Sequence, residues 1–152
     1  MTFPTSPPRG SEPRPWNFPA TVRTRLEGGL SVIAVRMASL PIVHVRWSFR
    51  SGRIHEPCLL TGVGRLVGAV ARHGTRRWDS KGLALRLDHL GAHLSVSVAP
   101  DNTVVSVQAL SQHLEQALEI AEEVAHRPTF PEPDIERERA KLLDLLLHRQ
   151  SE

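Results

Sequence analysis

Alternation of apolar and polar residues predicts five β-strands in this chain. Successive side chains of a strand point to opposite faces, so a period of two gives the strand one apolar face. Residues 42–49 show the pattern most clearly, with Val43, Val45, Trp47 and Phe49 on one face as expected core residues. The five expected strands are residues 21–26, 30–36, 42–49, 94–98 and 103–109.

Turn-forming residues join four of these strands into two hairpins. Glu27-Gly28-Gly29 separates the first two strands, and Pro100-Asp101-Asn102 separates the last two. Glycine, proline, aspartate and asparagine all favour tight turns. Pro41 and Ser51-Gly52 bound the strand between the hairpins, which therefore stands alone in sequence.

Apolar residues spaced three and four apart predict two helices between the hairpins. The first covers residues 60–73, and Gly74 is expected to end it in a left-handed conformation. The second covers residues 80–90, with Ser80 as its expected N-cap and Gly91 after its end.

A third helix is expected after the second hairpin, with Ser111 as its N-cap and Arg127-Pro128 as its end. Its expected buried stripe consists of Leu114, Leu118, Ala121 and Val124. Four glutamates, which we expect to face solvent without a functional role, are Glu115, Glu119, Glu122 and Glu123.

The last helix is expected to begin near Pro133 with acidic residues, which suit the positive end of a helix dipole. Opposite charges three residues apart predict the ion pairs Asp134/Arg137, Glu136/Arg139 and Glu138/Lys141. Five leucines in the final eleven residues need a partner surface, and the chain stops where another element is expected. We therefore expect a truncated chain.

This order of elements predicts an α+β fold, with helices packed on one face of a mostly antiparallel sheet. Residues 1–20 are rich in proline and are expected to form a flexible lead. Residues 21–152 are expected to form one domain. The chain of 152 residues is 40% hydrophobic, which is enough for a core of this size.

Composition and charge exclude several classes of function. No apolar stretch approaches the roughly 20 residues that span a membrane, and residues 1–19 lack the apolar core of a signal peptide, so we expect a cytoplasmic protein. The formal charge is +3, the arginines are scattered, and tyrosine is absent. Nucleic-acid binding, which favours clustered basic residues with aromatic residues between them, is therefore not expected.

Three residues invite a chemical role that their surroundings do not support. Cys58 is the single cysteine, so it cannot form an internal disulfide, and we expect a small buried thiol rather than a nucleophile. His89 and His93 are four residues apart, but Gly91 separates them where a helix gives way to a strand. They are therefore expected to be surface histidines rather than metal ligands.

Eight short motifs follow one another in a sensible order and spacing. They are Gly29-Leu30, Ser51-Gly52 with Glu56, Thr61 to Leu66, His73-Gly74-Thr75, Leu90-Gly91-Ala92, Asp101-Asn102-Thr103, Pro128-Thr129-Phe130 and Ile135 to Arg139. Together they resemble the insulinase-type M16 zinc peptidases, a family that includes pitrilysin and the subunits of mitochondrial processing peptidase. The resemblance covers most of the first domain of that family and implies its LuxS/MPP-like metallohydrolase fold.

The resemblance also implies a zinc site, with a His-x-x-Glu-His motif on the first helix and a third ligand, a glutamate, on the last. The corresponding positions here are Arg65, Gly68, Ala69 and Leu145, none of which has the family's chemistry. Neither His-x-x-Glu-His nor His-Glu-x-x-His occurs anywhere in the sequence. No catalytic residue, metal ligand or cofactor is therefore expected in this chain.

The resemblance then implies a non-catalytic subunit that pairs with a zinc-bearing M16 partner and shares a peptide substrate with it. Two alternatives remain open, an active zinc metalloendopeptidase and a purely structural subunit. Arg65 is interpreted either as a solvated helix residue or as a ligand for a carboxylate of a partner or peptide terminus. Gly68 is tolerable in a helix if another segment packs closely against it.

Overall fold

The computed structural model describes residues 15, 17–37 and 39–150. The chain divides into two compact units, Met1–Leu40 and Pro41–Glu152, and each is described by itself. Most of the lead expected for residues 1–20 lies outside the described residues.

The first unit contains the expected hairpin. Strands β1 (Thr21–Arg25) and β2 (Ser31–Val35) pair antiparallel, with Thr21 opposite Val35. The turn is closed by Leu26 N, which donates to Leu30 O at 2.9 Å. Gly29 has a φ of 84°, a left-handed conformation that glycine adopts without steric strain.

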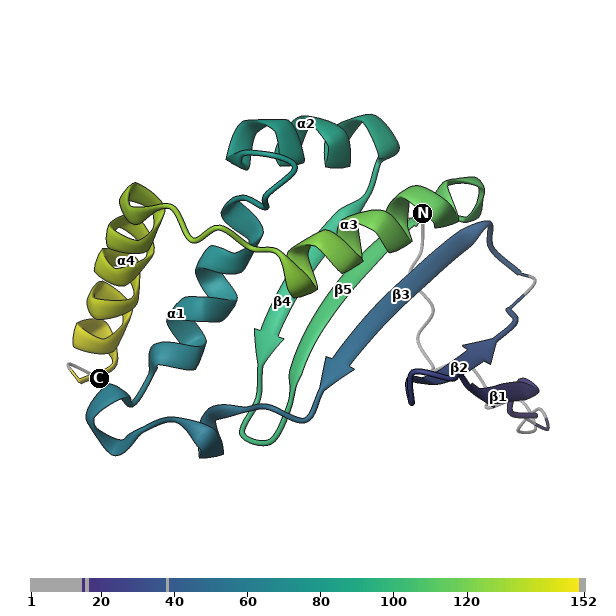
Figure 1. Cartoon of the computed structure of the whole chain (residues 1–152), viewed down its shortest axis with the longest axis horizontal. Coiled ribbons are helices and arrows are strands. Elements are labelled where there is room, and N and C mark those ends of the chain that lie inside the picture. Colours follow the sequence, from purple (N-terminus) through teal and green to yellow (C-terminus); the bar gives the residue numbers. More distant parts are fainter. Residues whose placement is uncertain (1–14, 16, 38, 151–152) are drawn as a thin grey trace, which may run out of the picture. The chain divides into compact units, whose positions relative to one another are not determined.

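The second unit is built on a three-stranded antiparallel sheet (Figure 1). Its strands are β3 (Ile42–Phe49), β4 (His93–Val98) and β5 (Thr103–Leu110), in the order β3-β5-β4. Among the described strands, β3 and β4 therefore form the edges of this sheet. Its antiparallel pairing, together with the helices described next, confirms the expected α+β fold.

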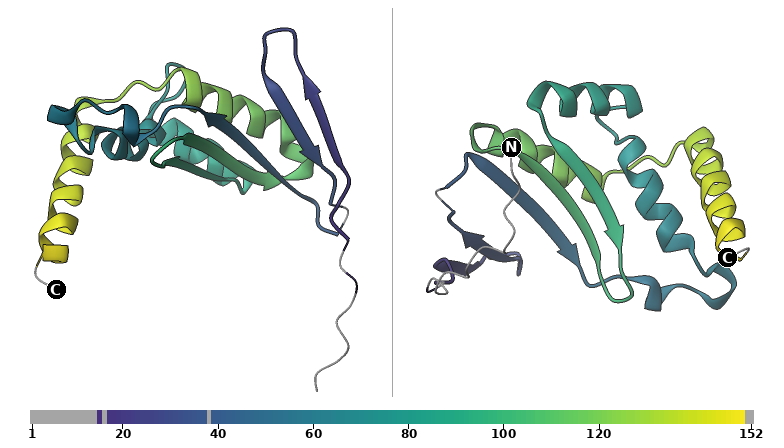
Figure 2. Two further views of the ribbon diagram at one scale, coloured as in Figure 1. Left: turned by 90° about the horizontal axis from the view of Figure 1, so that it is seen from below. Right: turned by 180° about the vertical axis from the view of Figure 1, so that it is seen from behind.

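Four helices accompany the sheet. They are α1 (Val63–Val70), α2 (Ser80–Leu90), α3 (Leu114–His126) and α4 (Glu132–Gln150). Four short 3-10 turns are η1 (Arg53–His55), η2 (Cys58–Leu60), η3 (Ala71–His73) and η4 (Ser111–His113). Helix α3 lies across the sheet, whereas α1 runs beside β4 with α4 on its outer side (Figures 1 and 2).

The core lies between the sheet and α3. Every second side chain of β3 packs against it, as the alternation predicts, including Trp47 and Phe49. Its centre is formed by Leu83, Val105, Val107, Ala117, Ile120, Ala121 and Val124, each at most 3% exposed. Burial of these apolar side chains is the main stabilising contribution to this unit.

The ends of the helices differ from the sequence predictions at three residues. Asp79 caps α2, because its side chain accepts a hydrogen bond from Gly82 N at 2.7 Å, and Ser80 is the first helical residue. Gly91 follows the end of α2 as predicted and is left-handed, with a φ of 56°, but Gly74, predicted to be left-handed, has a φ of 160° and is extended. Ser111 begins the turn η4 and provides no side-chain cap for α3.

The buried face of α3 is rotated from the predicted stripe. Leu114 and Leu118 are each 41% exposed, whereas Ala117 and Ile120 are fully buried. Small alanine side chains let the helix approach the sheet closely at this face. Glu123, predicted to face solvent, is only 5% exposed, and Arg127 one turn later forms an ion pair with it.

In the part of the chain that the structure describes, no helix has both the length and the apolar character needed to cross a membrane.

Replacing Ile120 tests which face of α3 stabilises the unit. Ile120→Ala should reduce the free energy of unfolding by about 2–5 kcal/mol, because it leaves a cavity in a fully buried site. The same substitution at Leu118, on the same helix, should cost no more than about 1 kcal/mol because much of that side chain is already exposed. Urea denaturation of both variants measures the difference, and equal losses would contradict the observed face.

Candidate functional site

A carboxylate from outside the helix accepts hydrogen bonds at the N-terminus of α1. Glu56 accepts hydrogen bonds from Gly62 N at 2.7 Å through Oε2 and from Gly64 N at 2.9 Å through Oε1. The first amide groups of a helix lack partners within it, and a negative charge suits that end of the helix dipole. A Cβ atom at Gly64 would lie 2.6 Å from Glu56 Oε1, so this contact needs glycine.

Helix α1 also lies directly against the edge strand β4. A Cβ atom at Gly68 would lie 3.0 Å from Val98 Cγ2 and 3.8 Å from Val96 O. Gly68 is buried, which confirms that a closely packed segment accompanies this helical glycine. A larger side chain here would require β4 or the helix to shift.

Three of the four positions that correspond to the family's zinc motif meet in one hollow. Arg65, Gly68 and Ala69 line a space of about 390 Å³ between α1, β4 and α4. The residue of α4 that lines it is Leu142, and Leu145 is not among its lining residues. Its remaining lining residues are Arg53, Arg72, Val96, Ser97 and Val98.

This hollow does not fit a zinc ion. Zinc is held by three or four nitrogen, sulfur or carboxylate donors, and guanidinium, glycine, alanine and leucine side chains supply none of them. Within the described ranges, no three His, Cys, Asp or Glu side chains are grouped closely enough to hold a metal ion. That finding includes His89 and His93, which lie exposed on α2 and β4.

A contact between a buried glutamate of α4 and a histidine joins α4 to η3, the turn that follows α1. Glu138 of α4 is 5% exposed, and its Oε1 lies 2.7 Å from Lys141 Nζ and 3.3 Å from His73 Nε2 of η3. The hydrogen bond from Lys141 lowers the pKa of Glu138 below its ordinary value of 4.5, and the charges of Lys141, His73 and Arg72 act in the same direction while burial opposes them.

All three predicted ion pairs of α4 are present. Arg137 pairs with Asp134, Arg139 with Glu136 at 3.3 Å, and Lys141 with Glu138. Only the Glu138 and Asp134 carboxylates among them are buried, so the other charges are largely solvated.

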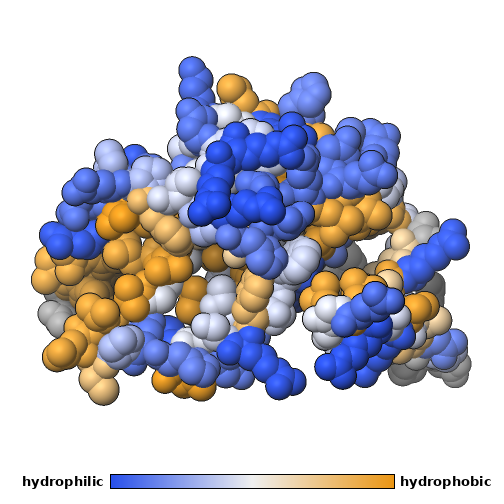
Figure 3. All heavy atoms as spheres, viewed as in Figure 1, coloured by the Kyte–Doolittle hydropathy of each residue, from blue (hydrophilic) through white to orange (hydrophobic). Residues whose placement is uncertain are grey.

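A second hollow, of about 1040 Å³, is mainly apolar and lies between the start of α1 and α4. Figure 3 shows apolar side chains gathered over this end of the unit. Leu59 in η2 is 98% exposed, and Leu143 and Leu146 in α4 are about half exposed. Cys58 also lines this hollow and is exposed, so the prediction of a buried thiol is wrong, because a three-residue turn at the surface cannot enclose it.

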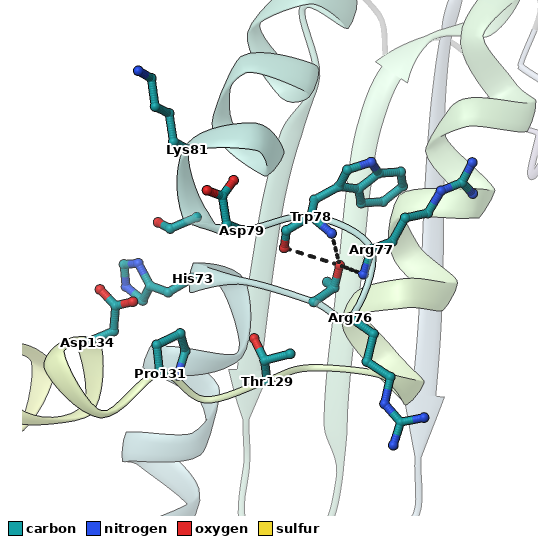
Figure 4. Close-up of a pocket in the computed structure, with 11 residues that line it drawn as sticks. His73, Arg76, Arg77, Trp78, Asp79, Lys81, Thr129, Pro131 and Asp134 are labelled. Carbon is teal, nitrogen blue, oxygen red and sulfur yellow. Dashed lines mark hydrogen bonds between the residues drawn. The ribbon is translucent and has the colours of Figure 1, made fainter.

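A third hollow surrounds the turn between η3 and α2 (Figure 4). Thr75 organises the turn, since its N donates to Trp78 O at 2.7 Å and its Oγ1 accepts from Trp78 N at 3.1 Å. An isolated bridge joins Thr75 to Pro128, so the turn connects two distant parts of the chain. The cationic side chains at its rim point away from one another, which indicates a structural turn rather than a binding site.

Sequence reasoning singled out Arg65 but not the other two arginines of the first hollow. Arg53 and Arg72 belong to 3-10 turns, where no periodicity relates them to Arg65. The role of Glu56 at the start of α1 was also missed, although its place in the family resemblance was a usable signal.

This chain is similar in sequence to known peptidases and to subunits of larger complexes. The family model of insulinase (peptidase family M16) matches residues 32–151. Mouse mitochondrial-processing peptidase subunit beta is 32% identical over 127 residues, which are 84% of this chain and 26% of that protein. Bovine cytochrome b-c1 complex subunit 1 is 28% identical over 130 residues, or 86% of this chain and 27% of that protein.

A solved structure has a similar fold. The peptidase M16 inactive domain from Pseudomonas fluorescens superimposes with a TM-score of 0.79 and 25% identity, over 87% of this chain and 32% of that one. The chain spans about a quarter of the curated relatives it matches. The chain belongs to the insulinase family of peptidases, family M16.

The contact between Glu56 and α1 predicts a loss of stability on neutralisation. Glu56→Gln should reduce the free energy of unfolding by about 1–2 kcal/mol, because an amide retains one acceptor oxygen and no charge at the helix N-terminus. Urea denaturation provides the measurement. The matched control is Glu27→Gln in the hairpin turn, where the described residues show no hydrogen bond, and a loss as large in this control would contradict the proposed cap.

The lowered pKa of Glu138 predicts a pH-dependent contribution to stability. A carboxylate whose pKa is lower in the folded state stabilises that state above the unfolded pKa and loses this effect as pH falls through the folded value. Glu138→Gln should therefore cost about 2 kcal/mol near neutral pH, and the difference from the unchanged chain should shrink as pH falls below 4.5.

Urea denaturation between about pH 7 and about pH 3 measures this difference. Glu136→Gln is the matched control, because that carboxylate is 61% exposed in its ion pair. A difference at Glu138 that stays constant across this pH range would contradict the assigned stabilisation.

Proposed function

We propose that this chain is a non-catalytic M16 subunit that pairs with a zinc-bearing M16 partner and contributes peptide binding to proteolysis. The observation that carries the proposal is the loss of every zinc donor at the positions of the family motif. Arg65, Gly68 and Ala69 replace the two histidines and the general base, and Leu145 replaces the third ligand. Without donors the chain cannot activate a water molecule by metal coordination.

The tight contact of Gly68 with β4 supports the same reading. A glutamate there would bring its Cβ to 3.0 Å from Val98 Cγ2, so the packing of α1 opposes a return of the general base. Zinc is expected in the partner chain, which would also supply the base.

The relatives support a role within an assembly. Two of them are named as subunits, one of a processing peptidase and one of the cytochrome b-c1 complex, and the similar solved structure is named an inactive domain. Exposed leucines of α4 offer a surface that a second chain can cover. The similarity to the b-c1 subunit favours one further candidate, a purely structural subunit.

Purification of the tagged protein from its native host, as the full reading frame, tests the proposal. We expect a co-purifying M16 chain that carries His-x-x-Glu-His, one zinc per pair, and peptide cleavage that requires both chains. Mass spectrometry identifies the partner, elemental analysis counts zinc, and a quenched-fluorescence peptide measures cleavage. The matched control is the partner prepared alone.

The other outcomes separate the alternatives. Stoichiometric zinc and peptide cleavage by this chain alone would establish an active metallopeptidase and refute the proposal. A stable assembly in which removal of this chain leaves cleavage unchanged would instead establish the structural role. If the proposal is right, this chain alone has no peptidase activity unless the three ligand positions (Arg65→His, Ala69→His, Leu145→Glu) and the general-base position (Gly68→Glu) are all restored.

A further inference from the structure

We infer that the hollow at the degenerate zinc position is an anion site that binds a carboxylate of a peptide. This inference deepens the proposed function, on which it rests, by naming the peptide chemistry that the chain recognises. Three arginines surround the space, Arg53 from η1, Arg65 from α1 and Arg72 from η3. The position that binds a zinc cation in the family motif is therefore positively charged in this chain and favours an anion.

The charged side chains that line this hollow are all positive. Of the described residues that line it, none is acidic. Most other arginines of this unit that border α2, α3 and α4 have carboxylate partners, including Arg77, Arg86, Arg127, Arg137 and Arg139. Within the described ranges no ion pair involves Arg53 or Arg65. Arg72 is partly engaged, because its charge contributes to the lowered pKa of Glu138.

The neighbouring carboxylate is already used elsewhere. Glu56 lies close in sequence to Arg53, but both of its oxygens accept hydrogen bonds from the backbone at the start of α1. Glu56 is not among the residues that line the arginine hollow, although it lines the neighbouring apolar hollow together with Arg53 and Arg65. Two guanidinium groups remain for a ligand.

The shape of the site suits a carboxylate group. Guanidinium presents parallel N–H donors that match the two oxygens of a carboxylate, and such charged hydrogen bonds are stronger than neutral ones. Val96 and Val98 of β4 and Leu142 of α4 form the apolar part of its lining, whereas the three arginines are exposed, so water and salt screen their charges. About 390 Å³ admits an acidic side chain or a chain terminus with its neighbouring residue.

The two sources of the carboxylate can be separated with three fluorescent peptides of otherwise equal sequence. One has an internal aspartate and an amidated C-terminus, one has a neutral side chain and a free C-terminus, and one is neutral and amidated. Fluorescence anisotropy with the purified chain measures their dissociation constants. We expect at least one carboxylate peptide to bind, the neutral amidated peptide not to bind, and affinity to fall as salt is raised.

Substitution of the arginines tests the site itself. Arg53→Gln and Arg65→Gln should each weaken binding of the carboxylate peptide by about tenfold or more. Arg46→Gln is the matched control, because Arg46 is exposed and belongs to the face of β3 that does not contact the core. Circular dichroism and thermal melting verify that each variant is folded.

Several results would overturn the inference. These are equal binding of the neutral amidated peptide, an affinity insensitive to both arginine substitutions, and binding of inorganic phosphate without binding of either carboxylate peptide. Because the assay uses this chain alone and measures binding rather than cleavage, its failure leaves the pairing with a zinc-bearing partner intact. Failure to find that partner, in turn, leaves the measured peptide affinity unchanged.

Discussion

The direct contact between α1 and the edge strand β4 is the constraint on which the site depends. Gly64 and Gly68 leave α1 without side chains where it faces Val98, and Val98 fills the space that a Cβ atom would need. Glu56 fixes the start of the same helix through the Gly64 amide. One short glycine pattern therefore lets α1 lie close against β4, and guanidinium groups contribute the charged side chains of the hollow beside it.

Helix α4 is attached in a different way from α3. The buried side chains of α3 are apolar apart from Glu123, whereas the buried side chains of α4, among those described, belong to Asp134 and Glu138. Charge pairs weaken with salt and with protonation, whereas apolar burial involves no charge that salt can screen. The unit thus combines a sheet and α3 that share an apolar core with an outer helix whose two buried side chains are carboxylates.

The sequence predicted those elements in which one preference dominates. Residues 42–49 alternate without interruption and form β3 over the same bounds. Prediction failed where two adjacent residues suit the same position. Asp79 and Ser80 are both good N-caps, and only the fold decides which of them caps α2. The face of α3 was misjudged because two adjacent stripes are apolar. Arg65 was found through its motif position, but its companion Arg53 approaches only through chain folding, which no local pattern encodes.

The single cysteine gives this architecture a convenient chemical handle. Cys58 is exposed at the edge of the apolar hollow between the start of α1 and α4. Because no other thiol exists in the chain, a maleimide dye would label one atom at one known place. Its alkylation rate and emission wavelength would then report whether a second chain covers the hollow, which shares Arg53, Arg65 and Leu142 with the arginine site.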